Sequence, residues 1–294
     1  QMTKTAWVFP GQGSQALGMG IDLLDIPTAK DKFAQAEAIL GWSVTDLCQN
    51  EEEKLSQTLY TQPSLYVVES ILADILRERG HKPDVVAGHS LGEYIALYIA
   101  GAFEWSAGLH LVKRRAELMD SAAGGMMAAL MNFDREQLEN VLAQTPDAVL
   151  ANDNSPGQVV ISGTPEAVRE VMSQVKAKRA IPLRTSGAFH SPFMAAAAAE
   201  FQDILELVEF QPVVVPVMSN VNPSPSTDIK IIKQRLSQQM TGLVRWREIS
   251  LQLPTEGIEE VVEIGPGNVL TNLIKRTTPD LTLKNVRNAA ELPV

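Results

Sequence analysis

Short apolar runs alternate with stretches of helical periodicity over the first hundred residues. Each apolar run stops at a glycine or proline turn, as buried strands do, and two of the helical stretches end directly before a glycine. The predicted strands are residues 5–9 and 84–87, and the predicted helices are residues 29–40, 64–79 and 91–100. This alternation favours an α/β fold with a parallel sheet covered by helices on both faces.

The rhythm changes after Gly125. The pattern there predicts strands at residues 127–131, 148–152, 158–162 and 180–183, with helices at residues 134–143 and 165–176. The order β-α-β-β-α-β is that of the ferredoxin-like motif. We therefore expect a ferredoxin-like small subdomain, residues 125–188, inserted into a larger catalytic core made of residues 2–124 and 189–294.

The α/β pattern resumes behind this insertion. Ser191 and Pro192 suit the N-cap and first position of a helix that extends to about residue 208. Residues 213–218 predict a strand, for which Pro216 indicates an edge position or a short segment. Residues 261–264 predict another strand. Asn268 is then a candidate N-cap for a helix that ends near residues 275–276.

Composition narrows the possible functions. The chain has 294 residues, of which 45% are hydrophobic and 20% charged, and its formal net charge is −10. No basic excess is available to neutralise phosphates, so a nucleic-acid partner is not expected. A single cysteine, Cys48, excludes an intramolecular disulfide and a cysteine-rich metal site, and fits a reducing cytoplasm.

Neither membrane insertion nor export is expected. No apolar run approaches the roughly 20 residues of a membrane span. The first ten residues read as a strand and not as a signal peptide. We expect a cytoplasmic protein without a metal or redox cofactor.

Gly88-His89-Ser90-Leu91-Gly92 fits the pattern G-x-S-x-G between a predicted strand and a predicted helix. This context is the one in which the pattern forms a nucleophile elbow, with small residues on both sides of a sharp turn. The hydroxyl then projects at a helix N-terminus, where free N–H groups can stabilise an oxyanion. An N-capping serine in a glycine turn is the alternative. The context favours Ser90 as a nucleophile.

A nucleophilic serine needs a base, and the sequence offers four histidines. His89 adjoins the serine and should point elsewhere, His81 lies in a turn and should be solvated, and His110 lies in a helix where a packed core position is expected. His190 remains, in the small-residue approach to a helix N-terminus, whose dipole disfavours the imidazolium. The group that orients the base is an acid such as Glu117, Asp120 or Asp153, or a backbone carbonyl.

Gly11-Gln12-Gly13-Ser14-Gln15-Ala16 follows the first strand and formally matches the dinucleotide fingerprint G-x-G-x-x-A. That interpretation needs a second strand with an acidic residue about twenty positions further on. Residues 30–40 are helical in pattern instead, so the fingerprint fails in context. A small-residue loop can also offer the N–H of Gln12 to a site beside Ser90.

Taken together, these residues resemble the malonyl-CoA:acyl carrier protein transacylase family over nearly the whole chain. The resemblance rests on the opening loop at residues 9–15, Thr61-Gln62-Pro63 before a long helix, residues 88–93, Gly187-Ala188-Phe189-His190-Ser191, and the closing turn at residues 264–270. It implies an α/β-hydrolase-like core with a ferredoxin-like insertion. It also implies an oxyanion hole formed by the backbone N–H groups of Gln12 and Leu91, and a His190 oriented by the backbone carbonyl of Gln239.

The resemblance further implies how an acyl group is recognised. Arg115 aligns with the family arginine that holds the malonyl carboxylate, although Ala116 and Asp120 depart from the family pattern and Arg114 leaves a doubt of one residue in register. A guanidinium suits a carboxylate because it can donate two parallel hydrogen bonds. Further candidate substrate contacts are Asn152, Met119 on the Arg115 helix, and Phe189, whose ring would occupy the space of a 2-methyl branch.

The expected reaction is a two-step exchange with malonyl-CoA and acyl carrier protein as partners. The expected pathway is fatty-acid synthesis, although a polyketide pathway could use the same enzyme. Ser90 takes the malonyl group from malonyl-CoA, and the phosphopantetheine thiol of the carrier protein takes it from the serine ester. Two alternatives remain open. One is an acyl hydrolase on the same scaffold, and the other is an inactive domain that binds carrier protein.

Overall fold

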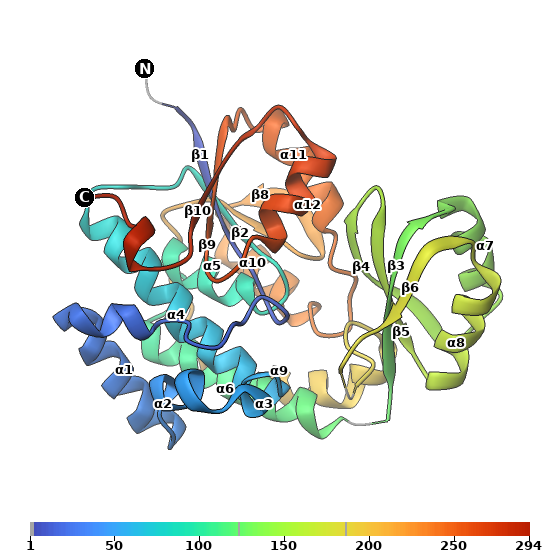
Figure 1. Cartoon of the computed structure of the whole chain (residues 1–294), viewed down its shortest axis with the longest axis horizontal. Coiled ribbons are helices and arrows are strands. Elements are labelled where there is room, and N and C mark those ends of the chain that lie inside the picture. Colours follow the sequence, from blue (N-terminus) through green and yellow to red (C-terminus); the bar gives the residue numbers. More distant parts are fainter. Residues whose placement is uncertain (1–2, 123, 186) are drawn as a thin grey trace.

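The structure, a computed structural model, describes residues 3–122, 124–185 and 187–294 and contains two sheets (Figure 1). The larger sheet has the strand order β10-β9-β1-β2-β7-β8. Its pairs are parallel except β7 with β8, which is antiparallel. Its strands are β1 (Thr5–Phe9), β2 (Val85–Gly88), β7 (Val217–Ser219), β8 (Asn222–Ser226), β9 (Glu260–Ile264) and β10 (Thr282–Val286).

Helices cover both faces of this sheet because successive residues of a buried strand point to opposite sides. In β1, Trp7 and Phe9 join one hydrophobic core, whereas Ala6 and Val8 join the other. The first core is closed by α1 (Pro27–Leu40), α2 (Val44–Asn50), α3 (Glu52–Leu55), α4 (Thr58–Glu78), α5 (Gly92–Ala100), α6 (Trp105–Ser121), α9 (Ala195–Leu207) and α10 (Ile229–Ser237). The second is closed by α11 (Trp246–Thr255) and α12 (Val269–Thr277). Short 3-10 helices are η1 (Ile21–Asp25), η2 (Pro192–Met194) and η3 (Ala289–Glu291).

The smaller sheet has the order β4-β5-β3-β6 and is antiparallel throughout. It contains β3 (Met126–Phe133), β4 (Ala148–Ser155), β5 (Gln158–Gly163) and β6 (Ala177–Pro182), and it packs on α7 (Arg135–Ala143) and α8 (Pro165–Gln174) around its own core. The predicted order β-α-β-β-α-β is confirmed, as is the fold class. The division at residues 125 and 188 stays a prediction. Residue 2, at which we expected the core to begin, and residues 123 and 186 lie outside the described residues.

The structure corrects several expected elements. Helix α4 begins at Thr58, not at residue 64, so Thr61-Gln62-Pro63 lies inside the helix and not before it. Pro63 is the sixth residue of α4, so it removes one intrahelical hydrogen bond, and the helix continues through it to Glu78. The strand expected at 213–218 is reduced to β7, and residues 213–216 before it are half-buried except for exposed Val214. Because β7 lies between β2 and β8, it is a short strand and not an edge strand.

Other elements gave no clear pattern and were not predicted, among them α2, α3, α10, α11, β8 and β10. Asn268 does occupy the N-cap position of α12, but its side chain makes no capping hydrogen bond. The buried Glu263 carboxylate accepts from the Thr271 N–H at 2.7 Å instead, so an acid from β9 caps this helix.

Among the described residues, no helix is long and apolar enough to cross a lipid bilayer. The loops that follow β1 and β2 leave the carboxyl edge of the parallel sheet, where α/β proteins place their ligands. In Figure 1 the smaller sheet stands beside this edge.

Candidate active site

Ser90 occupies a sharp turn between β2 and α5. Its φ of 53° lies in the left-handed region, which a residue with a side chain rarely adopts. A Cβ on Gly88 would meet the Gly92 backbone at 2.0 Å, and one on Gly92 would meet the Phe9 carbonyl oxygen at 2.0 Å. The two flanking glycines are therefore required by space, as the nucleophile-elbow interpretation demands.

The structure brings Ser90 and His190 together across a hundred residues of sequence. Ser90 Oγ lies 2.8 Å from His190 Nε2. On the other side of the ring, Nδ1 lies 3.0 Å from the Gln239 carbonyl oxygen and 3.1 Å from that of Gly242. Because a carbonyl can only accept, Nδ1 carries the proton and Nε2 is free to accept one from Ser90.

Burial, and after it the nearby positive charge of Arg115, lower the pKa of His190 to about 3. The carbonyls of Gln239 and Gly242 act in the opposite direction, because they stabilise the protonated ring. The imidazole is therefore neutral at pH 7. A neutral ring beside a serine hydroxyl is the state that a general base must have before it acts.

The other histidines do not contact Ser90 Oγ. His89 Nε2 lies 2.8 Å from Asn154 Oδ1, and His81 is exposed, both as expected. The packed core position expected for His110 is wrong. This side chain is exposed, because the buried face of α6 carries Gly108, Leu109 and Val112 on the opposite side.

The acids considered as partners of the base lie elsewhere. Asp153 forms ion pairs with Arg135 and Arg247, at 3.2 and 3.0 Å. Glu117 lies 3.8 Å from Arg114. The group beside His190 Nδ1 is thus a backbone carbonyl and not a carboxylate.

The loop after β1 packs directly against the elbow. A Cβ on Gly11 would come within 2.4 Å of the His89 carbonyl oxygen and 3.5 Å of the Leu91 nitrogen. In the part of the chain that the structure describes, neither the Gln12 nor the Leu91 N–H donates to a protein group. Two backbone donors beside Ser90 are available to an oxyanion.

Arg115 is fully buried on α6 and reaches the nucleophile. Its Nη1 donates to Gln62 Oε1 at 2.8 Å, and its Nη2 donates to Gln239 Oε1 at 3.0 Å and to Ser90 Oγ at 3.2 Å. Its Nε has no partner among the described residues. Arg114, by contrast, is partly exposed and pairs with Glu200 at 3.0 Å. The register that puts Arg115 in the site agrees with this geometry.

The remaining candidate substrate contacts are Met119, Phe189 and Asn152. Met119 is buried one turn after Arg115, with its Sδ 3.4 Å from Gln62 Nε2. Phe189 is buried in the main core, and an added Cβ on Gly187 would meet its ring at 2.6 Å. Asn152 has a buried Oδ1 without a partner among the described residues.

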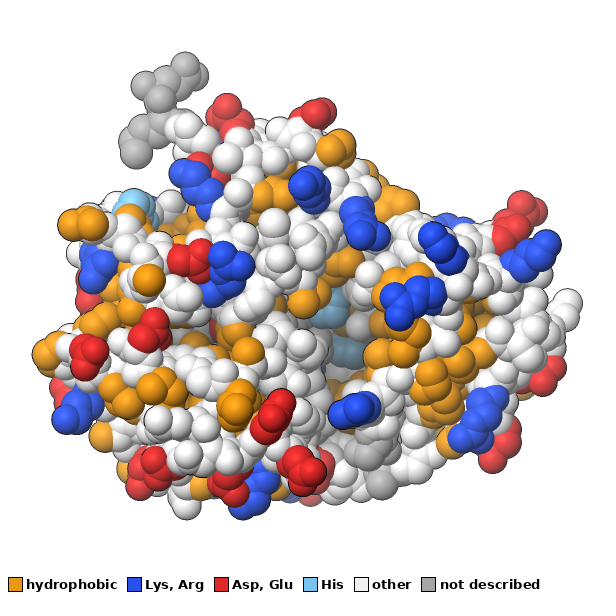
Figure 2. Space-filling model, viewed as in Figure 1, with side chains coloured by type: hydrophobic (Ala, Val, Ile, Leu, Met, Phe, Trp, Pro, Cys, Tyr) orange, Lys and Arg blue, Asp and Glu red, His pale blue; other side chains and the backbone are white. Residues whose placement is uncertain are grey.

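A cleft leads to this site between the two parts of the molecule. A cavity of about 330 Å³ extends from the Gly11–Ser14 loop and His89 to the smaller sheet, where Asn152 and apolar residues line it. Figure 2 shows a hollow at this place with histidine side chains visible inside it. Its size and mainly apolar wall suit a chain-like organic group.

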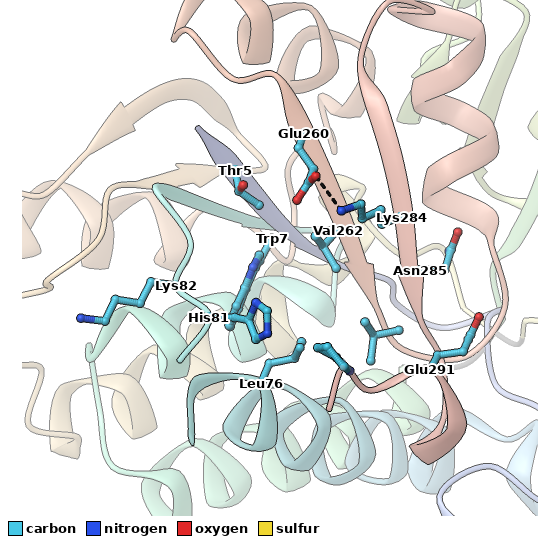
Figure 3. Close-up of a pocket in the computed structure, with 12 residues that line it drawn as sticks. Thr5, Trp7, Leu76, His81, Lys82, Glu260, Val262, Lys284, Asn285 and Glu291 are labelled. Carbon is cyan, nitrogen blue, oxygen red and sulfur yellow. Dashed lines mark ion pairs between the residues drawn. The ribbon is translucent and has the colours of Figure 1, made fainter. Parts of the chain in front are cut away.

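A second cavity, of about 380 Å³, lies at the opposite end of the sheet and is lined by Trp7, His81 and the ion pair of Glu260 with Lys284 (Figure 3). Its described lining includes none of Ser90, Arg115 and His190. Over the described ranges, no group of three or more His, Cys, Asp or Glu side chains could hold a metal ion.

Sequence reasoning missed three residues that support the site. Gln62 holds the Arg115 guanidinium, and Glu93 and Asn220 lie beneath Ser90. Gln62 and Glu93 belong to motifs quoted above, but as parts of a pattern and without a role. Asn220 gave no signal, because its proximity to Ser90 is created only by the pairing of β2 with β7.

An α/β core with a strained serine at the carboxyl edge of its sheet, paired with a histidine, defines an enzyme that forms acyl-serine esters. The family described as "Acyl transferase domain" matches residues 6–293, so the chain belongs to the acyl transferase family.

Individual relatives have names that are more specific than the description of the family. The chain is 57% identical to malonyl CoA-acyl carrier protein transacylase of Synechocystis sp. PCC 6803, over 98% of this chain and 99% of that protein. The crystal structure of the Synechocystis transacylase superposes with a TM-score of 0.97 over 99% of both chains. A malonyl-transacylase in complex with a type II PKS acyl-carrier protein superposes with a TM-score of 0.94 at 37% identity, over 99% of this chain and 98% of that one.

Proposed function

We propose that this enzyme transfers the malonyl group from malonyl-CoA to the phosphopantetheine thiol of acyl carrier protein, through an ester on Ser90. The observation that carries the proposal is the contact between Ser90 Oγ and both His190 Nε2 and Arg115 Nη2, at 2.8 and 3.2 Å. It combines a nucleophile, its base and a cation for a free carboxylate within one buried site.

In the first step, Ser90 Oγ attacks the thioester carbonyl of malonyl-CoA while its proton moves to His190 Nε2. Negative charge develops on the former carbonyl oxygen, and the N–H groups of Gln12 and Leu91 stabilise it. The tetrahedral intermediate then collapses and the carbon–sulfur bond breaks. The departing CoA sulfur takes the proton from His190, which leaves a malonyl-serine ester and a neutral imidazole.

The second step runs the same chemistry in reverse with a different thiol. The carrier-protein thiol gives its proton to His190 and attacks the ester carbonyl. The carbon–oxygen bond to Ser90 breaks, and Ser90 Oγ recovers the proton from His190. The carbonyl of Gln239 keeps Nδ1 protonated throughout, so Nε2 is always the atom that exchanges protons.

Arg115 selects the acyl group in this proposal. Both hydrogens of Nη2 are used in the resting site, by Gln239 Oε1 and Ser90 Oγ. A malonyl carboxylate that replaces Ser90 Oγ as acceptor would take one hydrogen bond from Nη2 and a parallel one from Nε, which has no partner among the described residues. Burial of the guanidinium removes competing water, which strengthens the pairing and makes an uncharged acyl group a poorer match. Asn152, Met119 and Phe189 are proposed to line the path of the substrate.

The test is incubation with labelled malonyl-CoA, with and without carrier protein, followed by intact-mass spectrometry. We expect a malonyl adduct to form without carrier protein, to pass to carrier protein when it is added, and to be absent from Ser90→Ala. An adduct that persists in Ser90→Ala would overturn the assignment of the nucleophile. Release of free malonate at the rate of adduct loss would indicate a hydrolase, and no adduct in the parent an inactive binding domain.

Fatty-acid synthesis as the pathway and the cytoplasm as the location stay predictions. The malonyl and carrier-protein chemistry in the names of the relatives fits fatty-acid synthesis and a polyketide pathway equally well. The single, buried cysteine supports a reducing compartment.

A further inference from the structure

The backbone of Ser90 is held on both sides by side chains that come from distant parts of the chain. Its N–H donates to Asn220 Oδ1 at 2.8 Å, and its carbonyl accepts from Gln239 Nε2 at 2.8 Å. A left-handed conformation at a residue with a side chain costs about 1–3 kcal/mol and persists only where the surroundings enforce it. These two hydrogen bonds hold the Ser90 backbone in that conformation.

A buried carboxylate joins the two amides. Glu93 Oε1 accepts from the Asn220 N–H at 2.8 Å and lies 3.4 Å from Gln239 Nε2. Asn220 Nδ2 also donates to the Gly88 carbonyl at 2.5 Å. We call Glu93, Asn220 and Gln239 the elbow cluster; none of the three is more than 1% exposed.

The elbow cluster also reaches the cation of the site. Gln239 Oε1 accepts from Arg115 Nη2 at 3.0 Å, while the amide nitrogen of the same side chain donates to Ser90. One amide therefore links the group proposed to hold the acyl carboxylate with the backbone of the nucleophile. Loss of either hydrogen bond to the Ser90 backbone would let Ser90 Oγ move relative to His190 and Arg115.

Burial of a carboxylate at this position is unfavourable in free energy, which argues for a specific role of Glu93. Burial raises the pKa of Glu93 to about 7, although hydrogen bonds from Asn220 and Gln239 and the charges of Arg115 and Arg235 act against that rise. An apolar side chain would avoid the desolvation but would leave the Asn220 N–H without its acceptor.

We propose that Glu93 and Asn220 are positioning residues of the acyl transfer, which hold Ser90 in its left-handed conformation so that Oγ lies between His190 and the acyl carbon. The proposal rests on the proposed role of Ser90 as nucleophile. A displacement of about 1 Å at a reacting atom can cost about a hundredfold in rate.

The experiment measures the single-turnover rate of malonyl-Ser90 formation against malonyl-CoA concentration. For Asn220→Ala and Glu93→Ala we expect the maximal rate to fall by about a hundredfold, with the half-saturating concentration unchanged within about twofold, because positioning affects the reacting atoms more than binding. Glu93→Gln keeps an acceptor oxygen of the same shape but not the charge, so it should recover only part of the rate that Glu93→Ala loses.

Asn285→Ala is the matched control. Its amide donates to Thr271 Oγ1 at 3.0 Å and lies 3.4 Å from the Glu263 carboxylate, so it removes a similar amide–carboxylate contact far from Ser90. We expect a parent-like acylation rate at a comparable loss of thermal stability. A folded Asn220→Ala that acylates at the parent rate, or that loses only affinity, overturns the proposal.

A pH profile keeps the proposal testable if the alanine variants do not fold. The charged or titratable groups beside Glu93 are Arg115, Arg235 and Tyr94. Burial raises the pKa of Tyr94 above its usual value, whereas burial and the charge of Arg115 lower that of His190, in the same site, to about 3. Glu93 is thus the member expected to titrate near pH 7. The parent rate should fall toward that of Glu93→Gln as pH drops through about 7, whereas Glu93→Gln should stay flat.

Parallel profiles of the parent and Glu93→Gln overturn the proposal. Its failure can be distinguished from failure of the proposed function. If the parent forms no malonyl-Ser90 ester, the nucleophile assignment is wrong; if the parent forms the ester and the elbow-cluster variants form it equally fast, only the positioning role is wrong.

Discussion

Replacement of Arg115 by alanine tests the acyl selectivity at the group on which it depends. The guanidinium is fully buried and has three hydrogen-bond acceptors in the resting site, on Gln62, Gln239 and Ser90. A malonyl carboxylate bound there would be desolvated, so alanine would leave it without a charged partner. Truncating one member of a buried, hydrogen-bonded charge pair costs about 2–5 kcal/mol.

At about 1.36 kcal/mol for each factor of ten, this loss corresponds to a decrease of about 30-fold to about 5000-fold in kcat/KM for malonyl-CoA. Acetyl-CoA carries no carboxylate and should lose far less. Arg115→Ala also leaves the amide oxygens of Gln62 and Gln239 without their donor, which affects the reaction of both substrates. The ratio of the two kcat/KM values is therefore the quantity to measure.

Two further variants, Arg114→Ala and Arg115→Lys, test whether the change in the ratio depends on the Arg115 guanidinium. Arg114→Ala removes a partly exposed arginine whose ion pairs with Glu117 and Glu200 lie at the surface, and such pairs contribute about 1 kcal/mol or less. Its malonyl-to-acetyl ratio should match the parent. Arg115→Lys should recover part of the ratio, because an ammonium lacks the two-pronged geometry. If Arg115→Ala leaves the ratio unchanged, the carboxylate is held elsewhere and the reasoning fails.

Three further outcomes are expected. His190→Ala should slow acylation by about 10²–10⁴-fold, the usual value of a general base, while exposed His81→Ala should not; a loss below about tenfold would point to another base. Phe189→Ser should raise methylmalonyl-CoA activity relative to malonyl-CoA by an amount equivalent to about 1–3 kcal/mol, and an unchanged ratio in a folded variant would mean that the branch is excluded elsewhere. Glu69 is fully buried with both carboxylate oxygens unpartnered among the described residues, and burial, reinforced by the charge of Glu263, raises its pKa well above 4.5. The folded chain thus keeps a proton that the unfolded chain loses, so stability falls as pH rises above 4.5, by up to about 1.4 kcal/mol per pH unit. Glu69→Gln removes that dependence and should stabilise more at pH 8 than at pH 5 in denaturant unfolding; equal gains would contradict it.

Local patterns were most reliable where one short segment carries its own physical reason. Gly88 and Gly92 flank Ser90 at fixed spacing because any side chain there would overlap backbone atoms, so the elbow could be recognised from five consecutive residues. The β-α-β-β-α-β order of the small subdomain could be read because each element is short and regular. By contrast, α4 was predicted to begin too late, because a proline is a poor marker of a helix start when it lies in the second turn.

Interactions between distant segments were harder to predict. His190 was identified by elimination among four histidines, each of which was judged from its local sequence setting. One of those judgements was wrong, because His110 is exposed and not packed in the core. The backbone partner of His190 entered through family resemblance, because a carbonyl leaves no mark in the amino-acid sequence. Gln62 and Asn220 had no assigned role, since a neutral amide has a function only once its partners are in place.

The sequence by itself determined many of the strands and helices, although not β8, β10, α10 or α11. It also determined the strained serine turn, the small inserted sheet and the set of residues able to perform acyl transfer. Those features depend on periodicity, on steric limits and on residue chemistry, which act within a few positions. Only the tertiary structure decided that Ser90, Arg115, His190 and Gln239 share one site, with Glu93 and Asn220 beneath it. Parallel strands meet at a common carboxyl edge whatever their separation in sequence, and burial at that edge then sets the charge state of His190 and the strength of the Arg115 contacts.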